Sequence, residues 1–208
     1  MNIINELASE KGEKGSKANQ EVALKCIENP DFLDDLINFI DLKNTKLLGD
    51  ICEVFTETAK INPELTIPYF DILIELTKHK NGRVQWESMH CIALMAHLIP
   101  EIGNYLDELS EKIRTYKGVI VRDYAIDTIS NYAKISYETA SSAYPILIEA
   151  LSLWECKHTA KVIQGLKNVL EQLPDLKDEI AKLIEPFISH QSSRIQKEAK
   201  RLKKQLIS

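Results

Sequence analysis

The chain has 208 residues, of which 44% are hydrophobic and 27% are charged, and its formal net charge is −5. This length is sufficient for one well-buried core, and the composition is that of an ordinary globular protein, which excludes a disordered chain. Gly and Pro are scarce, with seven of each, and the abundance of Leu, Ile, Ala, Glu and Lys favours helix. No stretch approaches the roughly 18 to 20 apolar residues of a membrane span, and the N-terminus lacks a signal-peptide pattern. We therefore expect a cytoplasmic protein that does not contact membranes.

The charge is unevenly distributed along the chain. Residues 191–208 carry six Lys or Arg against one Glu, which leaves −10 for residues 1–190. A mainly acidic body argues against a dedicated nucleic-acid binder, so we interpret the basic C-terminal segment as a solvated helix face. The four cysteines are Cys26, Cys52, Cys91 and Cys156. They show no metal-binding spacing, and we expect them to be reduced and inert.

The N-terminal part differs from the rest of the chain. Two short segments, residues 2–10 and 16–29, flank the polar residues 11–15 and predict a degenerate capping pair of helices over residues 1–29. Pro30 and the following Asp31 predict the start of a helix that runs to about Leu42. This helix should be about one turn shorter than its counterparts in the later repeats.

From residue 61 onward, a short phrase recurs that ends one helix and begins the next. Its third residues lie 37 positions apart and are Pro63, Pro100, Tyr137 and Pro174. Proline suits the first helical position because its missing N–H has no intrahelical partner there, and the carboxylate that follows each third residue favours the positive end of the helix dipole. Each phrase therefore predicts a helix start.

A second column with the same step of 37 marks the other helix of each repeat. It consists of Asn44, Asn81, Gly118, Glu155 and Ser192. Most of these residue types cap helix N-termini, so the repeating unit is a pair of antiparallel helices. We expect about twelve helices in a single domain over residues 1–208. The repeats should span residues 30–62, 63–99, 100–136, 137–173 and 174–208.

Apolar columns confirm the period. The second helices should bury three columns, which are Leu47, Val84, Val121, His158 and Ile195; Ile51, Ser88, Ala125, Val162 and Ala199; and Phe55, Ile92, Ile129 and Leu166. A first-helix column reads Ile72, Leu109, Ile146 and Leu183. Within each second helix the columns fall at i, i+4 and i+8, which makes one apolar stripe.

Three features resemble the HEAT-repeat family. These are the two-helix unit, the prolines inside the first helices at Pro68, Pro145 and Pro186, and the pair Val121-Arg122 beside a short turn. The resemblance covers about residues 30–208 and implies an all-α fold, a right-handed α-α superhelix or HEAT-like solenoid. It also implies that the second helices line a concave face where partners bind.

Subtracting the core columns leaves an outward ridge on the second helices. It consists of Gly49, Glu53, Thr56, Lys60, Trp86, His90, Ala93, His97, Asp123, Asp127, Ser130, Lys134, Ala160, Gln164, Lys167 and Glu171. We predict that a partner binds at Glu53, Trp86, His90, His97, Asp127, Gln164 and Lys167; the alternative is that this ridge is only a solvated polar surface. Trp86 is the expected anchor, because Trp is concentrated at binding hot spots; partial burial against Lys46 or Arg83 is the alternative. Neighbouring helices lie too far apart for metal ligation, so we expect no metal, cofactor or catalytic residue.

A cationic column precedes the ridge. It consists of Lys46, Arg83, Lys157 and Arg194. We favour a ladder of ion pairs with carboxylates between repeats, and an anion site is the alternative.

The expected function is that of a non-enzymatic scaffold that binds another protein or a peptide. The alternative is a nucleic-acid-binding relative of the alkylpurine DNA glycosylases, which are also HEAT-like. That family has an Asp four residues after a Trp, and here His90 follows Trp86. The missing carboxylate and the acidic body make nucleic acid the weaker hypothesis. Nothing in the sequence distinguishes a third option, the HEAT-like bilin lyases.

Overall fold

A computed structural model describes residues 2–40 and 43–207. This part of the chain contains twelve α-helices, six 3-10 segments and no strand. The predicted all-α class and the number of helices are therefore confirmed. The chain divides into two compact units, Met1–Met95 and Ala96–Ser208. The repeat boundaries and the single domain stay predictions.

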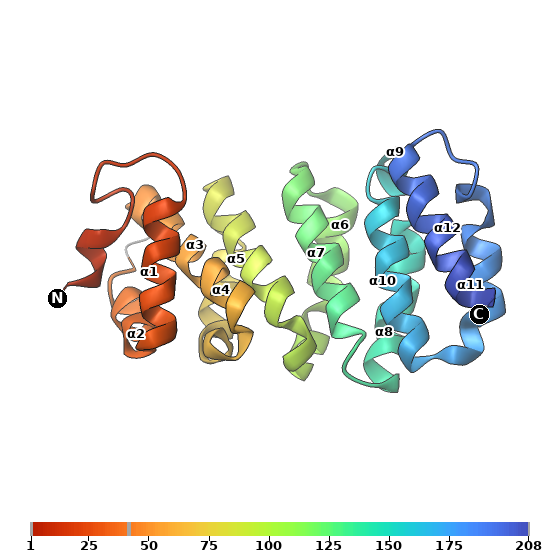
Figure 1. Cartoon of the computed structure of the whole chain (residues 1–208), viewed down its shortest axis with the longest axis horizontal. Coiled ribbons are helices and arrows are strands. Elements are labelled where there is room, and N and C mark those ends of the chain that lie inside the picture. The colour runs from red at the N-terminus through yellow and green to blue at the C-terminus, as the bar shows by residue number, and fades with distance from the viewer. Residues whose placement is uncertain (1, 41–42, 208) are drawn as a thin grey trace. The chain divides into compact units, whose positions relative to one another are not determined.

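In unit 1, helices pack on both sides of one central helix. Its elements are η1 (Ile3–Glu6), α1 (Lys17–Glu28), α2 (Asp31–Asn38), α3 (Thr45–Ile61), η2 (Pro63–Tyr69), α4 (Phe70–Leu76) and α5 (Gly82–Met95). Helix α3 packs between α1 and α5, as Figure 1 shows. The shorter helices α2 and α4 contact α3 and α5, respectively.

Unit 2 repeats this arrangement. Its elements are η3 (Ala96–Leu98), η4 (Pro100–Tyr105), α6 (Leu106–Thr115), α7 (Val119–Tyr132), α8 (Tyr137–Ala150), α9 (Leu153–Cys156), α10 (Thr159–Gln172), η5 (Pro174–Leu176), α11 (Lys177–Ile184), η6 (Glu185–Phe187) and α12 (Ser193–Ile207). Helix α10 packs between α7 and α12 (Figure 1). None of the described helices of either unit is both long enough and apolar enough to cross a membrane.

The predicted helix starts are confirmed. Pro63, Pro100 and Pro174 each occupy the first turn of a 3-10 segment that continues into an α-helix. Tyr137 begins α8, where the Oγ of Ser136 accepts a hydrogen bond from a backbone N–H within the first turn. The three helices that begin with proline change geometry part-way, because a 3-10 turn holds about 3.0 residues and an α turn holds 3.6.

Four of the five residues in the capping column stand at helix starts. Asn44, Asn81 and Gly118 precede α3, α5 and α7, and Ser192 precedes α12. The Oδ1 of Asn44 accepts from a backbone N–H of α3 at 3.3 Å. The prediction for Glu155 is wrong, because α10 begins only at Thr159.

The displaced start of α10 has a backbone cause. Three consecutive residues, Trp154, Glu155 and Cys156, have φ values of 54°, 55° and 63°. This left-handed conformation costs an L-residue about 1 to 2 kcal/mol. Glycine is the usual residue in this conformation, and none of these three positions is a glycine, so the sequence pattern could not predict the turn.

The predicted second-helix columns form the core. Phe55, Ile92, Ile129 and Leu166 are all fully buried, and His158 is 2% exposed. The first-helix column is only partly correct, since Leu109 is buried whereas Ile72, Ile146 and Leu183 are half-buried. There the deeper residue stands one position later, at Leu73, Leu147 and Ile184.

The N-terminal pair is more degenerate than expected. Only residues 3–6 of the first segment form a helix, a 3-10 turn whose Ile3 is buried. The helix predicted to begin at Pro30 and Asp31 is α2, which ends at Asn38. Its expected end near Leu42 lies outside the described residues.

Several ridge residues face neighbouring helices instead of solvent. Buried members of the predicted ridge are Gly49, Thr56, Ala93, Ser130 and Ala160. At Gly165, an added Cβ would lie 2.1 Å from Ser130 Oγ, so α10 and α7 approach each other closely at this side chain. Small residues therefore belong to the contacts between adjacent second helices.

As predicted, the cysteines are free thiols, and burial raises the pKa of Cys26 and Cys52 to about 12.

Candidate functional site

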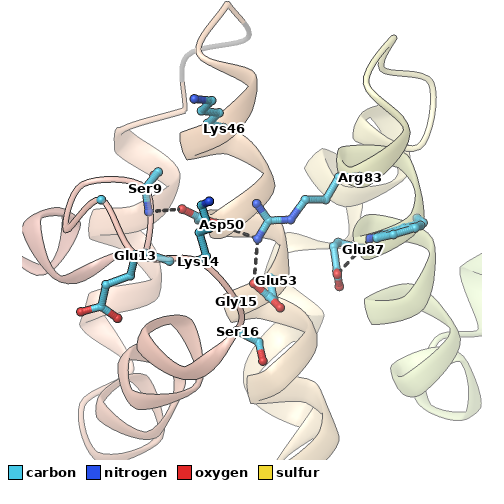
Figure 2. A pocket seen from close by; sticks show the side chains of 13 residues that line it. Ser9, Glu13, Lys14, Gly15, Ser16, Lys46, Asp50, Glu53, Arg83 and Glu87 are labelled. Carbon is cyan, nitrogen blue, oxygen red and sulfur yellow. Dashed lines mark hydrogen bonds and ion pairs between the residues drawn. The ribbon is translucent and has the colours of Figure 1, made fainter.

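The candidate site is a pocket of about 590 Å³ in unit 1 (Figure 2). The second helices α3 and α5 form one side of it and the loop before α1 forms the other. Its lining residues are Ala8, Ser9, Gly12, Glu13, Lys14, Gly15, Ser16, Lys46, Asp50, Glu53, Arg83, Trp86 and Glu87. Four of these, Lys46, Glu53, Arg83 and Trp86, are sequence-predicted site residues.

A buried polar network forms the floor of the pocket. Asp50 is 2% exposed, and its Oδ1 accepts from Asn19 Nδ2 at 2.9 Å and from Arg83 Nη2 at 2.6 Å. The same two nitrogens donate to Glu53 Oε2 at 2.6 and 2.7 Å. Each donor thus bridges two carboxylates, and the network joins α1, α3 and α5.

The loop before α1 is tied to this network. The backbone N–H of Ser9 donates to Asp50 Oδ2 at 2.7 Å, and the N–H of Ala8 donates to Asn19 Oδ1 at 3.0 Å. Gly12 and Gly15 have φ values of 67° and 101°. Glycine adopts this region without a steric penalty, so the loop can turn back over the pocket.

Electrostatics distinguish the two ends of the pocket. Burial by itself would raise the pKa of Asp50, but the hydrogen bonds from Ser9, Asn19 and Arg83 outweigh it and hold the pKa below its usual value. Burial raises the pKa of Glu87 and the negative charge of Glu53 adds to this effect, while hydrogen bonds from Thr56 and Trp86 and the charge of Arg83 act in the opposite direction. Among the described residues, Arg83 therefore forms an ion pair with Asp50 at one end of the pocket but not with Glu87 at the other.

Trp86 is half-buried at the Glu87 end, next to a neutralised cation. Its indole Nε1–H donates to Glu87 Oε1 at 2.9 Å. Arg83 spans from α5 to α3, where an added Cβ on Gly49 would lie 3.2 Å from Arg83 Cδ. Gly49 therefore leaves room for the side chain of Arg83 to cross α3.

The cationic column behaves unevenly. Arg83 makes the ion pairs with the preceding repeat that a ladder requires. Lys46, Lys157 and Arg194 are exposed. The ladder and the anion site both stay predictions for these three residues.

The remaining predicted ridge residues divide between the units. His90 lies on α5 of unit 1 and is half-buried. In unit 2, His97 lies in η3 and Asp127 on α7, and both are half-buried. Gln164 and Lys167 lie exposed on α10. Their participation in one binding surface stays a prediction.

Unit 2 has polar contacts of its own between second helices. Lys161 Nζ lies 2.5 Å from Asp127 Oδ2 and 5.8 Å from the centre of the Tyr124 ring. His158 Nδ1 lies 2.7 Å from Asp123 Oδ1. These carboxylates are already engaged by the chain's own side chains.

The turn before α10 covers a buried arginine. Arg122 is 2% exposed and its guanidinium carbon lies 3.7 Å from the centre of the Trp154 ring. Its Nη1 donates to the backbone oxygen of Tyr116 at 3.1 Å, and the Trp154 indole N–H donates to the oxygen of Ile113 at 2.8 Å. The arginine of the HEAT-like pair is thus held by an aromatic ring and a carbonyl.

Among the residues that sequence reasoning missed are Asp50 and Glu87 of the pocket and Asn19 of the polar network that forms its floor. Asn19 is fully buried within α1, and Asp50 stands directly before the core residue Ile51. A polar residue beside a core column is a weak signal, because most such residues face solvent.

Within the described residues, no group of three or more His, Cys, Asp or Glu side chains could hold a metal ion.

Comparisons with known proteins locate the fold. No family model and no curated protein matches the chain. An engineered protein from the Northeast Structural Genomics Consortium superposes with a TM-score of 0.71 at 19% identity, with 99% of each chain covered. A second engineered protein from the same consortium gives 0.69 at 16% identity, covering 100% of this chain and 97% of the other.

A third solved structure is a designed armadillo repeat protein in complex with the peptide (KR)4. It gives a TM-score of 0.69 at 18% identity, covering 99% of this chain and 98% of that one. None of these comparisons supports the nucleic-acid alternative. At such low identities the similarities show the fold alone: this chain has the helical-repeat fold of HEAT- and armadillo-type proteins.

Proposed function

We propose that the chain is a non-enzymatic protein-interaction module whose second-helix surface around Trp86 binds a segment of another protein. The observation that carries this proposal is the pocket of unit 1, which has a half-exposed Trp86 at its wall and a tightly bonded polar floor. Rigid walls reduce the entropy lost on binding, and aromatic anchors dominate binding energy at interfaces.

An extended peptide segment is the form of partner that we favour. The designed armadillo repeat protein with a similar fold is in complex with a peptide. We further propose that the module acts in the cytoplasm. His97, Asp127, Gln164 and Lys167, which belong to unit 2, are further partner-binding residues in this proposal.

Nucleic acid is the less suitable partner on electrostatic grounds. Unit 1 contains 16 Asp and Glu against 10 Lys and Arg, a formal charge of −6. An acidic surface repels the phosphate backbone that provides most of the affinity in nucleic-acid binding.

The test begins with capture of partners from the source cell by the tagged chain, followed by purification of each candidate. Binding of a purified candidate is then measured by calorimetry to the wild type, Trp86→Ala and Tyr137→Ala. Tyr137 is the matched control, because it is an aromatic residue that is 63% exposed and lies on α8, outside the second helices. We expect Trp86→Ala to weaken binding by at least about 1 to 2 kcal/mol and the control to leave it unchanged. A partner that binds all three proteins equally would contradict the proposal.

A further inference from the structure

We propose that the Trp86–Glu87 end of the pocket binds a basic side chain, Arg or Lys, of the partner. This inference rests on the proposed function and specifies the chemistry of the partner at the same surface. It follows from a partly buried carboxylate that makes no ion pair among the described residues, from an aromatic face beside that carboxylate, and from an ion pair beside an aromatic ring in unit 2.

The carboxylate that makes no ion pair among the described residues is that of Glu87. It is half-buried, and its Oε1 accepts a hydrogen bond from the neutral indole of Trp86. Arg83 is the only cation with ion pairs among the described pocket residues, and these go to Asp50 and Glu53. Burial raises the pKa of Glu87, and the nearby charge of Arg83, whose ion pairs go to other carboxylates, only partly offsets this effect.

The pocket could in principle attract an anion, because Lys14 and Lys46 also line it. Both lysines are exposed, so water already solvates their charges. The carboxylate of Glu87 is partly removed from water and gains most from an opposite charge. The lining residues carry four carboxylates and three cations, so an entering anion would meet net repulsion. A cation is therefore the favoured guest.

Trp86 supplies a second attraction for a cation. The face of an indole ring attracts an ammonium or a guanidinium within about 6 Å of its centre, and arginine also stacks on it through its planar group. The half-exposed ring leaves part of its surface open to the pocket.

Unit 2 contains a cation between an aromatic ring and a carboxylate, at other positions of the repeat. Tyr124 and Asp127 stand on the second helix α7, and Lys161 of α10 reaches both the ring and the carboxylate. Trp86 and Glu87 stand on the second helix α5, and there no cation of the described residues ion-pairs with the carboxylate. A partner's basic side chain would contact the ring of Trp86 and the carboxylate of Glu87 in unit 1, as Lys161 contacts a ring and a carboxylate in unit 2.

The experiment follows the indole N–H signals of the full-length ¹⁵N-labelled chain by NMR. The chain has two tryptophans, and Trp154 is an internal control because its N–H is bonded to a backbone carbonyl. The probes are the capped peptide Gly-Arg-Gly, its Lys counterpart, its citrulline counterpart and inorganic phosphate. We expect Arg and Lys to shift the Trp86 signal in a saturable manner, and we expect no shift of this signal with citrulline or phosphate.

Glu87→Gln tests the charge directly, because the amide oxygen can still accept from the Trp86 indole. We expect it to weaken binding of the Arg peptide at least about fivefold. Glu171→Gln, on an exposed residue of α10, is the matched control. Thermal unfolding of each variant, followed by circular dichroism, checks that it is folded.

Equal responses to Arg and citrulline, a response to phosphate in place of Arg, or an unchanged affinity of Glu87→Gln would overturn the inference. A protein partner that requires Trp86 but tolerates Glu87→Gln would leave the proposed function standing and refute only the basic side chain. Binding of the Arg peptide together with a partner that ignores Trp86→Ala would refute the proposed function instead.

Discussion

Lys161 of α10 lies with its Nζ 2.5 Å from Asp127 Oδ2 of α7, and this ion pair links two adjacent second helices of unit 2. Burial raises the pKa of Asp127, and the charge of Lys161 acts in the opposite direction. We expect Lys161→Ala to lower the free energy of unfolding by about 1 to 3 kcal/mol, because it leaves a partly buried carboxylate without a cation.

Urea denaturation of Lys161→Ala, Asp127→Asn and the double variant checks this first prediction. The double variant should be more stable than the sum of the single changes implies, because Asn removes the charge that Lys161→Ala exposes. Strict additivity of the three values would show that the two side chains do not interact.

A second prediction concerns the acid stability of unit 1. The pKa of Asp50 is lowered in the folded chain, so the unfolded chain binds a proton more readily at this residue. The resulting stability is present above the unfolded pKa of about 3.9 and is lost as the pH falls through the folded pKa. Asp50→Asn should be less stable at pH 7, and below pH 4 it should lose less stability than the wild type. Denaturation midpoints from pH 7 to pH 2 measure this difference; parallel curves for the two proteins would contradict it.

The third prediction tests the core of each unit separately. Phe55 and Leu166 are both fully buried on second helices, one in each unit. Truncating either to Ala should cost about 2 to 5 kcal/mol, because it removes apolar contacts and leaves a cavity. Guanidinium unfolding followed by circular dichroism provides the values. Lys60→Ala, on an exposed residue of α3, should change them little.

A fourth prediction reverses the usual effect of glycine in a helical chain. Glu155 has a φ of 55°, which an L-residue adopts at a cost and glycine adopts freely. Glu155→Gly should therefore stabilise the protein by about 1 kcal/mol. The matched change Glu171→Gly in the regular helix α10 should destabilise it by about the same amount. Thermal melts of the two variants decide the point, and a loss of stability in both would argue against the left-handed turn.

The helix starts and most of the core could be predicted from the sequence because their causes are local. Pro63 and Pro174 begin helices since a first-turn proline loses no hydrogen bond, and Asn44 caps α3 through a backbone group three residues away. Phe55 and Ile92 are buried because a 37-residue step keeps the apolar stripe on the same face of successive helices.

The site depended on contacts between segments distant in the chain. The sequence placed Trp86 and Arg83 on a second helix, but the ion pair from Arg83 to Asp50 spans 33 residues, and the hydrogen bond from Asn19 to Asp50 spans 31. Such pairs form only where packed helices bring two side chains within about 3 Å, and a periodic pattern does not specify that distance. The sequence determined which faces of the helices meet. Only the tertiary structure decided that Asp50 would form an ion pair with Arg83 and that Glu87 would form none among the described residues, because charge compensation depends on which side chains can reach across the helix contacts.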